Sequence, residues 1–206
     1  MRTRTACTGV VRRMTEPTYD TLRVMLESRL SAEAVAHSVR VADTAAEIAR
    51  VYGLDPAEAR VAGLLHDWDR ETDGAMLMER AARAGLPVTD ADRSVPSLLH
   101  GPVAAVALAD DVGGLTPEVL GAIGAHTYGA SEMSPLAKLV YVADVIEPGR
   151  SQPSVHALRE AVGDVTLDEL FARTYIASLM HVVETRRTMH PVTLQVYNRH
   201  VAKARP

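Results

Sequence analysis

Residues 35–52, VAHSVRVADTAAEIARVY, are the stretch of sequence that decides the fold. Side chains recur here at helical spacing along two adjoining lines. The first line is Val35, Val39, Ala42, Ala46 and Ala49, and the second is His37, Val41, Ala45, Ile48 and Tyr52. A helix that is apolar around so much of its circumference belongs in the centre of a helical protein. His37 lies inside this apolar helix and therefore needs a polar partner there.

Signals for helix starts and stops surround this central segment. Three capping residues each precede a proline, which suits the first turn of a helix: Asp55-Pro56, Thr116-Pro117 and Ser134-Pro135. Glycines that favour helix ends occur at Gly53, Gly85, Gly113-Gly114 and Gly163. Alternation of apolar and polar residues over the length of a strand is absent, and aromatic residues make up only 4%. The sequence therefore predicts an all-α, compact multi-helix bundle of eight to ten helices, with loops near 68–74, 86–96, 127–134 and 147–154.

Length and composition fit one globular domain. The 206 residues are 47% hydrophobic and 23% charged, which is ordinary for a domain of this size. We expect a disordered N-terminal extension over residues 1–15 and a single domain over residues 16–206. The single cysteine, Cys7, excludes an internal disulfide framework, so we expect a cytoplasmic setting. No window approaches 18 uncharged apolar residues, so we expect no membrane-spanning helix.

The net charge of −4 conceals two basic ends. Residues 1–15 carry four arginines and residues 185–206 carry five basic groups, and neither end contains an acidic residue. Residues 16–184 consequently carry a net charge of −13. Sequence-independent binding of nucleic acid over the whole surface is not expected, because it would need an extended basic face. Contact of the basic ends with RNA or ribosomes remains a minor alternative.

Histidines and carboxylates occur where apolar helical runs end. His66-Asp67 closes the run 61–65, His126 closes the run 119–125, and Asp144 follows the run 139–143. Unpaired buried charges are costly, so a shared cation would satisfy these groups most economically. Imidazole and carboxylate without thiolate suit Fe, Mn, Zn or Mg. Two such ions about 3.5–4 Å apart, bridged by a carboxylate, are the arrangement that serves phosphoryl displacement.

Five separated segments resemble, in the same order, the YqeK branch of the HD-domain metal-dependent phosphohydrolase superfamily. The segments are AHSVRVA (36–42), AGLLHD (62–67), LHGPVA (99–104), AHTYG (125–129) and MSPLAKLVYVADVIEPGR (133–150). The C-terminal segment MHPVT (189–193) and Tyr197-Asn198 continue the resemblance. It extends over about residues 16–200 and implies an HD-domain helical bundle for most of the chain.

The resemblance implies an enzyme, a symmetrical bis(5′-nucleosyl)-tetraphosphatase. This phosphoric anhydride hydrolase splits diadenosine tetraphosphate and related dinucleoside tetraphosphates into two nucleoside diphosphates by attack of a metal-activated water. The resemblance also implies two divalent or trivalent metal ions, most often iron, with Mn, Zn or Mg as alternatives. One ion would be held by His37, His66, Asp67 and Asp144. Asp67 would bridge to a second ion, completed by His100 and His126.

The candidate catalytic residues are Asp67 and Arg70, and the candidate substrate-binding residues are Arg70, Thr127, Gly129, Lys138 and Arg150. Arg70 stands where the resembled branch usually has lysine, in the pattern His-Asp-x-x-Lys. Its guanidinium pKa is too high for proton donation, so we assign Arg70 to charge stabilisation. The loop with Thr127 and Gly129 is expected to bind phosphate through backbone N–H groups. Asp69 and Glu71, on either side of Arg70, are expected to be solvated loop acids.

Two other functions remain as alternatives to this interpretation. The nearer one is an HD-type phosphohydrolase acting on another nucleotide, such as a nucleoside monophosphate, a deoxynucleoside triphosphate or an alarmone. The other is a metal-containing, nucleotide-binding regulatory module without turnover, against which the presence of all six candidate ligands argues. The expected partner is therefore a small-molecule dinucleoside polyphosphate. A homodimer is one candidate oligomeric state.

Overall fold

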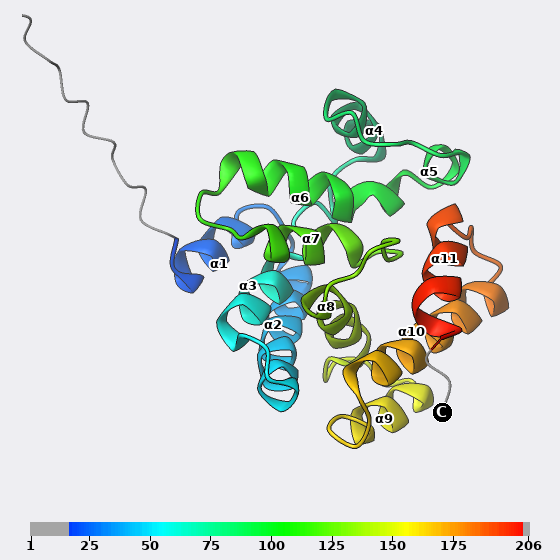
Figure 1. The fold of residues 1–206 in the computed structure, drawn as a ribbon. Coiled ribbons are helices and arrows are strands. Elements are labelled where there is room, and N and C mark those ends of the chain that lie inside the picture. The colour runs from blue at the N-terminus through cyan, green and yellow to red at the C-terminus, as the bar shows by residue number, and fades with distance from the viewer. Residues whose placement is uncertain (1–16, 204–206) are drawn as a thin grey trace, which may run out of the picture.

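The computed structural model describes residues 17–203. Regular structure in this part of the chain is helical throughout, without a strand, and Val162 and Val165 form an isolated β-bridge (Figure 1). The predicted all-α class is confirmed. The expected extension over residues 1–15 lies outside the described residues. Among the helices described, none combines the length and apolar character needed to span a membrane.

The described segment contains eleven α-helices, one 3-10 helix (η1) and a π-helical C-terminal turn (η2). Their bounds are α1 Tyr19–Glu27, α2 Ala32–Tyr52, α3 Pro56–Leu65, α4 Gly74–Arg83, α5 Asp90–Ser94, η1 Pro96–Leu99, α6 His100–Asp111, α7 Pro117–Ala125, α8 Pro135–Ile146, α9 Pro153–Glu160, α10 Leu167–Glu184, α11 Pro191–Val196 and η2 Tyr197–Val201. The count exceeds the expected eight to ten, and the short helix α5 lies in a predicted loop. The predicted caps Asp55, Thr116 and Ser134 are confirmed, since each side chain accepts a backbone N–H in the first turn of its helix.

Helix α2 is central, as predicted. Its side chains Val41, Ala42 and Ala45 are fully buried, and the helix packs against both α3 and α8. Gly63 of α3 permits the closest approach, because a Cβ there would lie 2.9 Å from the Cα of Ala42. This tight crossing brings the C-terminal end of α3 beside the middle of α2.

Helix α8 lies in the interior among α2, α3, α7 and α10 (Figure 1). Its central residues 139–143 are all buried, which matches their unbroken apolar sequence. Helices α6 and α7 pack against each other, and α7 also contacts α3 and α8. The packing therefore brings the ends of α3 and α7, the start of α6 and the later turns of α8 toward the N-terminal part of α2.

Candidate metal centre

All six predicted ligands come together in one cluster. His37 lies in the second turn of α2 and Asp144 lies near the end of α8. His66 and His126 are the C-terminal caps of α3 and α7, and His100 begins α6. Within residues 17–203, two overlapping groups have ligand atoms that all lie within 4.8 Å of one another. These groups are His37, His66 and Asp67, and Asp67, His100 and His126.

The carboxylate of Asp67 faces two different sets of ligands. Its Oδ2 lies 3.7 Å from His37 Nε2 and 3.3 Å from His66 Nε2. Its Oδ1 lies 3.1 Å from His100 Nε2 and 3.4 Å from His126 Nε2. A carboxylate with one oxygen toward each of two ligand sets has the geometry of a bridge between two cations.

Asp144 completes the first ligand set. Its Oδ1 lies 3.0 Å from His37 Nε2 and 3.8 Å from His66 Nε2. Asp144 comes from α8, whereas His37 and His66 come from α2 and α3, so this set depends on the packing of three helices. The second set instead joins the start of α6 to the end of α7 through Asp67.

Three of the histidines are held in one tautomer by their own backbone. The Nδ1 atoms of His66, His100 and His126 lie 2.8, 2.6 and 2.7 Å from the carbonyl oxygens of Gly63, Ser97 and Ile123, respectively. A carbonyl oxygen only accepts hydrogen bonds, so each Nδ1 carries a proton, and in the neutral imidazole each Nε2 has the lone pair. This is the tautomer that binds metal ions through Nε2.

The fit to a cation is supported by buried nitrogen atoms without hydrogen bonds. Among the described residues, Nε2 of His37 and Nε2 of His66 are buried and have no hydrogen-bond partner. Both nitrogens nevertheless lie close to carboxylate oxygens of Asp67 and Asp144. A nitrogen lone pair that faces a carboxylate needs a cation or a proton between the two atoms. The residues present therefore fit a bound metal ion.

The pKa values of Asp67, Asp144 and His66 also indicate that the cluster attracts positive charge. Burial alone would raise the pKa of Asp67, but His66, His100 and His126 outweigh it and hold this pKa far below its ordinary range. Burial opposes ionisation of Asp144 as well, yet His37 and His66 lower its pKa. Burial alone would lower the pKa of His66, whereas Asp67 and Asp144 raise it to about 9. Both carboxylates are thus anionic at neutral pH and attract a cation.

Both arginines that are predicted to bind phosphate border the cluster. Arg70 Nη1 lies 3.4 Å from Asp67 Oδ2, and 53% of the Arg70 side chain is exposed. Arg150 Nη2 lies 3.2 Å from Asp144 Oδ1, and its side chain is also partly exposed. Each guanidinium thus contacts one proposed ligand and still reaches solvent. This is a suitable position for contacting a phosphate group that enters the cluster.

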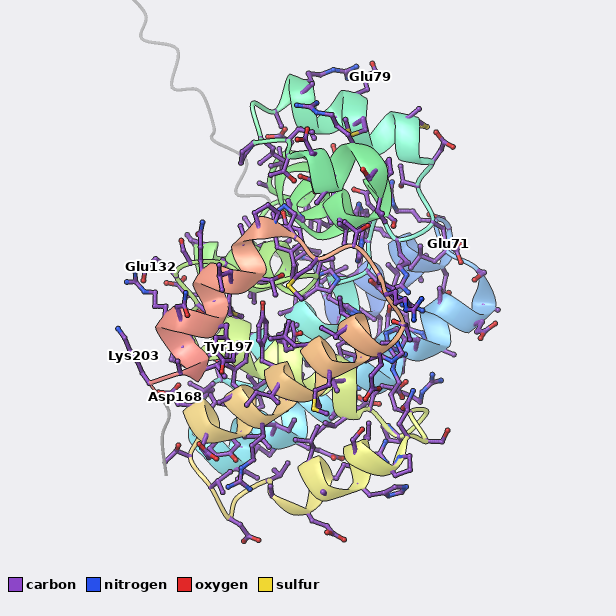
Figure 2. The ribbon with its side chains drawn as sticks, turned by 90° about the vertical axis from the view of Figure 1, so that its right-hand side faces the viewer. Glu71, Glu79, Glu132, Asp168, Tyr197 and Lys203 are labelled. Carbon is purple, nitrogen blue, oxygen red and sulfur yellow. The ribbon has the colours of Figure 1, made fainter. Side chains whose placement is uncertain are left out.

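The other predicted substrate residues differ in their surroundings. Thr127 Oγ1 is buried beside His126 and has no hydrogen-bond partner within the described chain, so Thr127 remains a candidate. Gly129 N–H donates to the carbonyl oxygen of Ala125 at 2.9 Å. This N–H is therefore already engaged, and the binding of phosphate by the loop stays a prediction that depends on its other groups. Lys138 Nζ forms an ion pair at 2.8 Å with Asp168 of α10, which is labelled in Figure 2. The structure therefore does not bring Lys138 into the cluster.

The expectation for Asp69 is wrong, because this residue is fully buried. Its Oδ1 accepts hydrogen bonds from Arg29 and Arg80, each at 2.8 Å, and from Thr72 at 2.9 Å. These contacts hold the turn that carries His66 and Asp67. Glu71 is exposed, as expected, and accepts hydrogen bonds from Ser31 at the start of α2 (Figure 2).

Sequence reasoning missed the ion pairs of Asp69 because its partners are 40 residues before it and 11 residues after it. It also missed Glu147, which is buried and hydrogen bonds to His37 Nδ1 at 3.2 Å. The position of Glu147 directly after α8, three residues beyond Asp144, was the available signal.

The fold and the cluster together define a class, the helical proteins with a buried cluster of histidines and aspartates suited to hold metal ions. Within this class the comparison with known families is specific. The HD domain family matches residues 34–149, a range that is more than half of the chain and includes all six proposed ligands. The chain belongs to the HD domain family.

Individual relatives match over most of the chain. The symmetrical bis(5′-nucleosyl)-tetraphosphatase of Staphylococcus aureus is 30% identical over 175 residues, which cover 84% of this chain and 90% of the relative. The protein of the same name from Bacillus subtilis is 29% identical over 173 residues, with coverage of 84% and 92%. A crystal structure from Clostridium acetobutylicum, titled a "predicted HD superfamily hydrolase involved in NAD metabolism", superposes with a TM-score of 0.84 at 31% identity. That superposition covers 92% of this chain and all of the other.

Proposed function

We propose that this protein is a metal-dependent hydrolase that cleaves diadenosine tetraphosphate and related dinucleoside tetraphosphates symmetrically into two nucleoside diphosphates. The observation that carries the proposal is the buried Asp67 carboxylate, with one oxygen toward each of two ligand sets. The proposal is also supported by relatives that match 84% of this chain at about 30% identity and are named symmetrical bis(5′-nucleosyl)-tetraphosphatases. The substrate is thus a small dinucleoside polyphosphate.

The proposed metal ions have distinct sets of ligands. His37, His66, Asp67 and Asp144 would hold one ion, and Asp67, His100 and His126 would hold the other. When bound, the ions supply a nucleophilic water at neutral pH and positive charge for the phosphate oxygens. Iron is the proposed metal, with Mn, Zn or Mg as alternatives, and elemental analysis of the purified protein tests this assignment.

The chain itself supplies the groups that bind and orient the phosphates. Arg70 and Arg150 lie on the borders of the cluster, where their planar guanidinium groups can each donate two hydrogen bonds to a phosphate. Neither arginine releases a proton at neutral pH, so both act by charge and position. The unpartnered Oγ1 of Thr127 is the further candidate donor beside His126.

Product analysis tests the proposed cleavage. Purified protein supplied with metal and diadenosine tetraphosphate should form ADP as the only nucleotide product. ATP together with AMP would contradict symmetrical cleavage. Hydrolysis of a nucleoside monophosphate, a deoxynucleoside triphosphate or an alarmone instead would favour the alternative HD-type activity, and binding without any product would favour a regulatory module.

A matched pair of variants links the activity to the cluster. Asp67→Asn removes the negative charge of the proposed bridge and should abolish hydrolysis. Asp43→Asn removes an exposed aspartate that forms an ion pair with Arg60, and it should retain the activity of the unmodified protein. Equal activity of both variants would contradict the role of Asp67.

A cytoplasmic location and a homodimer remain predictions. Fractionation of cells tests the location, and light scattering tests the oligomeric state.

A further inference from the structure

The four histidines of the cluster are not oriented in the same way. His66, His100 and His126 lie at helix ends, where a carbonyl three residues earlier is within reach of Nδ1. His37 lies in the interior of the 21-residue helix α2. Carbonyl groups in a helix interior are already bonded to the backbone N–H groups of the following turn. The Nδ1 of His37 therefore needs a partner from another part of the chain.

Glu147 is that partner. Its Oε1 lies 3.2 Å from His37 Nδ1, and its side chain is only 2% exposed. Its Oε2 accepts hydrogen bonds from Arg40 Nε at 2.6 Å and from the backbone N–H of Gly149 at 2.5 Å. Oε1 also accepts a hydrogen bond from Arg40 Nη2 at 3.4 Å, so the carboxylate is held by Arg40 and Gly149 with Oε1 facing the imidazole.

The segment that carries Glu147 is itself held in place. Arg159 of α9 donates hydrogen bonds to the carbonyl oxygens of Ile146, Glu147 and Arg150. A Cβ on Gly149 would lie 2.7 Å from Arg40 Nη2, so the turn after α8 packs directly against the Arg40 guanidinium. The position of the Glu147 carboxylate is thus determined by contacts with α2 and α9.

We propose that Glu147 is a positioning residue that keeps the proton of His37 on Nδ1 and directs His37 Nε2 at the metal. A neutral imidazole carries one proton, and a proton on Nε2 would prevent ligation through that atom. A carboxylate that accepts the Nδ1 proton fixes the tautomer and orientation of the ring and makes the ligand more basic. The inference rests on the metal centre of the proposed function.

A pair of variants separates this role from the ion pair with Arg40. Glu147→Leu removes the carboxylate that accepts the His37 proton, whereas Arg40→Met removes the cation of the ion pair and leaves that carboxylate, with the Gly149 N–H bonded to it, opposite His37 Nδ1. Titration calorimetry of the full chain with Zn²⁺ measures the affinity of the metal centre. Glu147→Leu should weaken one class of site by about 10- to 100-fold, the usual effect of losing such a partner. Arg40→Met should keep the Zn²⁺ affinity within about threefold of that of the unmodified chain, because the Glu147 carboxylate remains as the acceptor.

Asp92→Asn is the matched control for these variants. Asp92 is a fully buried carboxylate 3.3 Å from the Nε2 of His190, a histidine outside the cluster, so its replacement should leave Zn²⁺ affinity unchanged. Thermal melts of each variant verify folding. Zn²⁺ affinity of Glu147→Leu equal to that of the unmodified chain would overturn the inference, and so would an Arg40→Met affinity as weak as that of Glu147→Leu.

A spectroscopic measurement tests the tautomer without any change at Glu147. In the Zn²⁺-loaded protein with ¹⁵N-labelled histidine, the His37 signals should show a protonated Nδ1 and a ligated Nε2. Loss of these signals in His37→Gln assigns them. A ligated or unprotonated Nδ1 would overturn the inference. Failure of the unmodified protein to bind Zn²⁺ would contradict the metal centre itself, whereas normal binding with an unaffected Glu147→Leu variant would contradict only the role of Glu147.

Discussion

Arg70 shows how much one side chain contributes beside the metal centre. It stands where lysine is usual in the resembled branch, and its guanidinium lies 3.4 Å from Asp67 Oδ2. Because we assign Arg70 to charge stabilisation, Arg70→Lys should retain kcat within about tenfold. Arg70→Gln removes the positive charge and should lower kcat by about 10²-fold, the lower end of the range for a positioned donor.

Steady-state kinetics with diadenosine tetraphosphate measure both Arg70 variants. The lysine variant is the control, since it preserves the charge while changing the shape of the cation. If the glutamine variant hydrolysed the substrate as fast as the lysine variant, the charge of Arg70 would have no role in the reaction.

His66 gives the metal-free protein a pH dependence. Its pKa rises from an ordinary 6.5 to about 9 in the folded state, mainly because of Asp67. A histidine with a raised folded pKa stabilises the fold fully below its unfolded pKa, and the stabilisation is lost as the pH rises through the folded pKa. We therefore expect the free energy of unfolding, measured by urea titration with a chelator present, to fall between about pH 6.5 and pH 9.

Two comparisons sharpen this measurement. His66→Gln removes the titrating group, so the slope over this pH range should flatten. Bound metal replaces the proton on His66, so the metal-loaded protein should also lack the slope. A free energy of unfolding that stayed constant or increased from pH 6.5 to pH 9 in the chelated protein would contradict the assignment to His66.

Among the structural elements, the loop after α7 depends on a glycine. Gly129 has a φ of 86°, which favours glycine, and a Cβ at this position would lie 2.7 Å from Val196 Cγ2 of α11. Gly129→Ala should therefore destabilise the protein by about 1–3 kcal/mol, as measured by urea unfolding. The contact joins the loop beside His126 to the C-terminal helices.

Gly121 of α7 provides the matched control for Gly129. It lies in a regular helix, and a Cβ there would meet no atom within 4 Å. Gly121→Ala should therefore stabilise the protein by up to about 1 kcal/mol, the difference in helix propensity between the two residues. Similar effects of the two substitutions would show that neither the positive φ nor the contact with Val196 constrains position 129.

Across the whole molecule, the proposed metal centre joins helices that are distant in the sequence. The proposed ligands lie in or at the ends of α2, α3, α6, α7 and α8, so bound metal stabilises the packing of all five. Metal at about 100 times its Kd contributes about 2.7 kcal/mol per site. For a chain of this size we expect the Tm to rise by about 5–10 °C for each occupied site.

Thermal melts before and after chelation measure this rise. Asp67 contributes to both ligand sets, so Asp67→Asn should remove most of the metal-dependent shift. The exposed variant Asp43→Asn should keep it. A Tm that is the same with and without metal would show that the cluster does not bind metal in the folded protein.

The local parts of this architecture could be predicted from the sequence. Periodicity and capping depend on residues within a few positions of one another, so Asp55, Thr116 and Ser134 predicted helix starts correctly. Polar residues at the ends of apolar runs identified candidate ligands for the same reason. His66 and His126 are helix caps, and a cap is where a buried helix can present a polar side chain.

The long-range contacts could not be predicted in this way. Asp69 is buried because Arg29 and Arg80 converge on it, and Lys138 pairs with Asp168 on α10. A charged residue in a sequence has many potential partners, and the packing of the helices selects among them. The same reason explains why sequence reasoning missed Glu147.

By itself, the sequence determined the helical class, the helix starts and the residue types available to hold a metal. Only the tertiary structure decided which oxygen of Asp67 faces which histidines, and which carboxylate orients His37. The physical reason is the range of the interactions. Helix formation and capping act along the chain within one or two turns. The two ligand sets on either side of Asp67 and the tautomer of His37 depend on groups up to 110 residues apart in the sequence. These groups meet only when the helices pack.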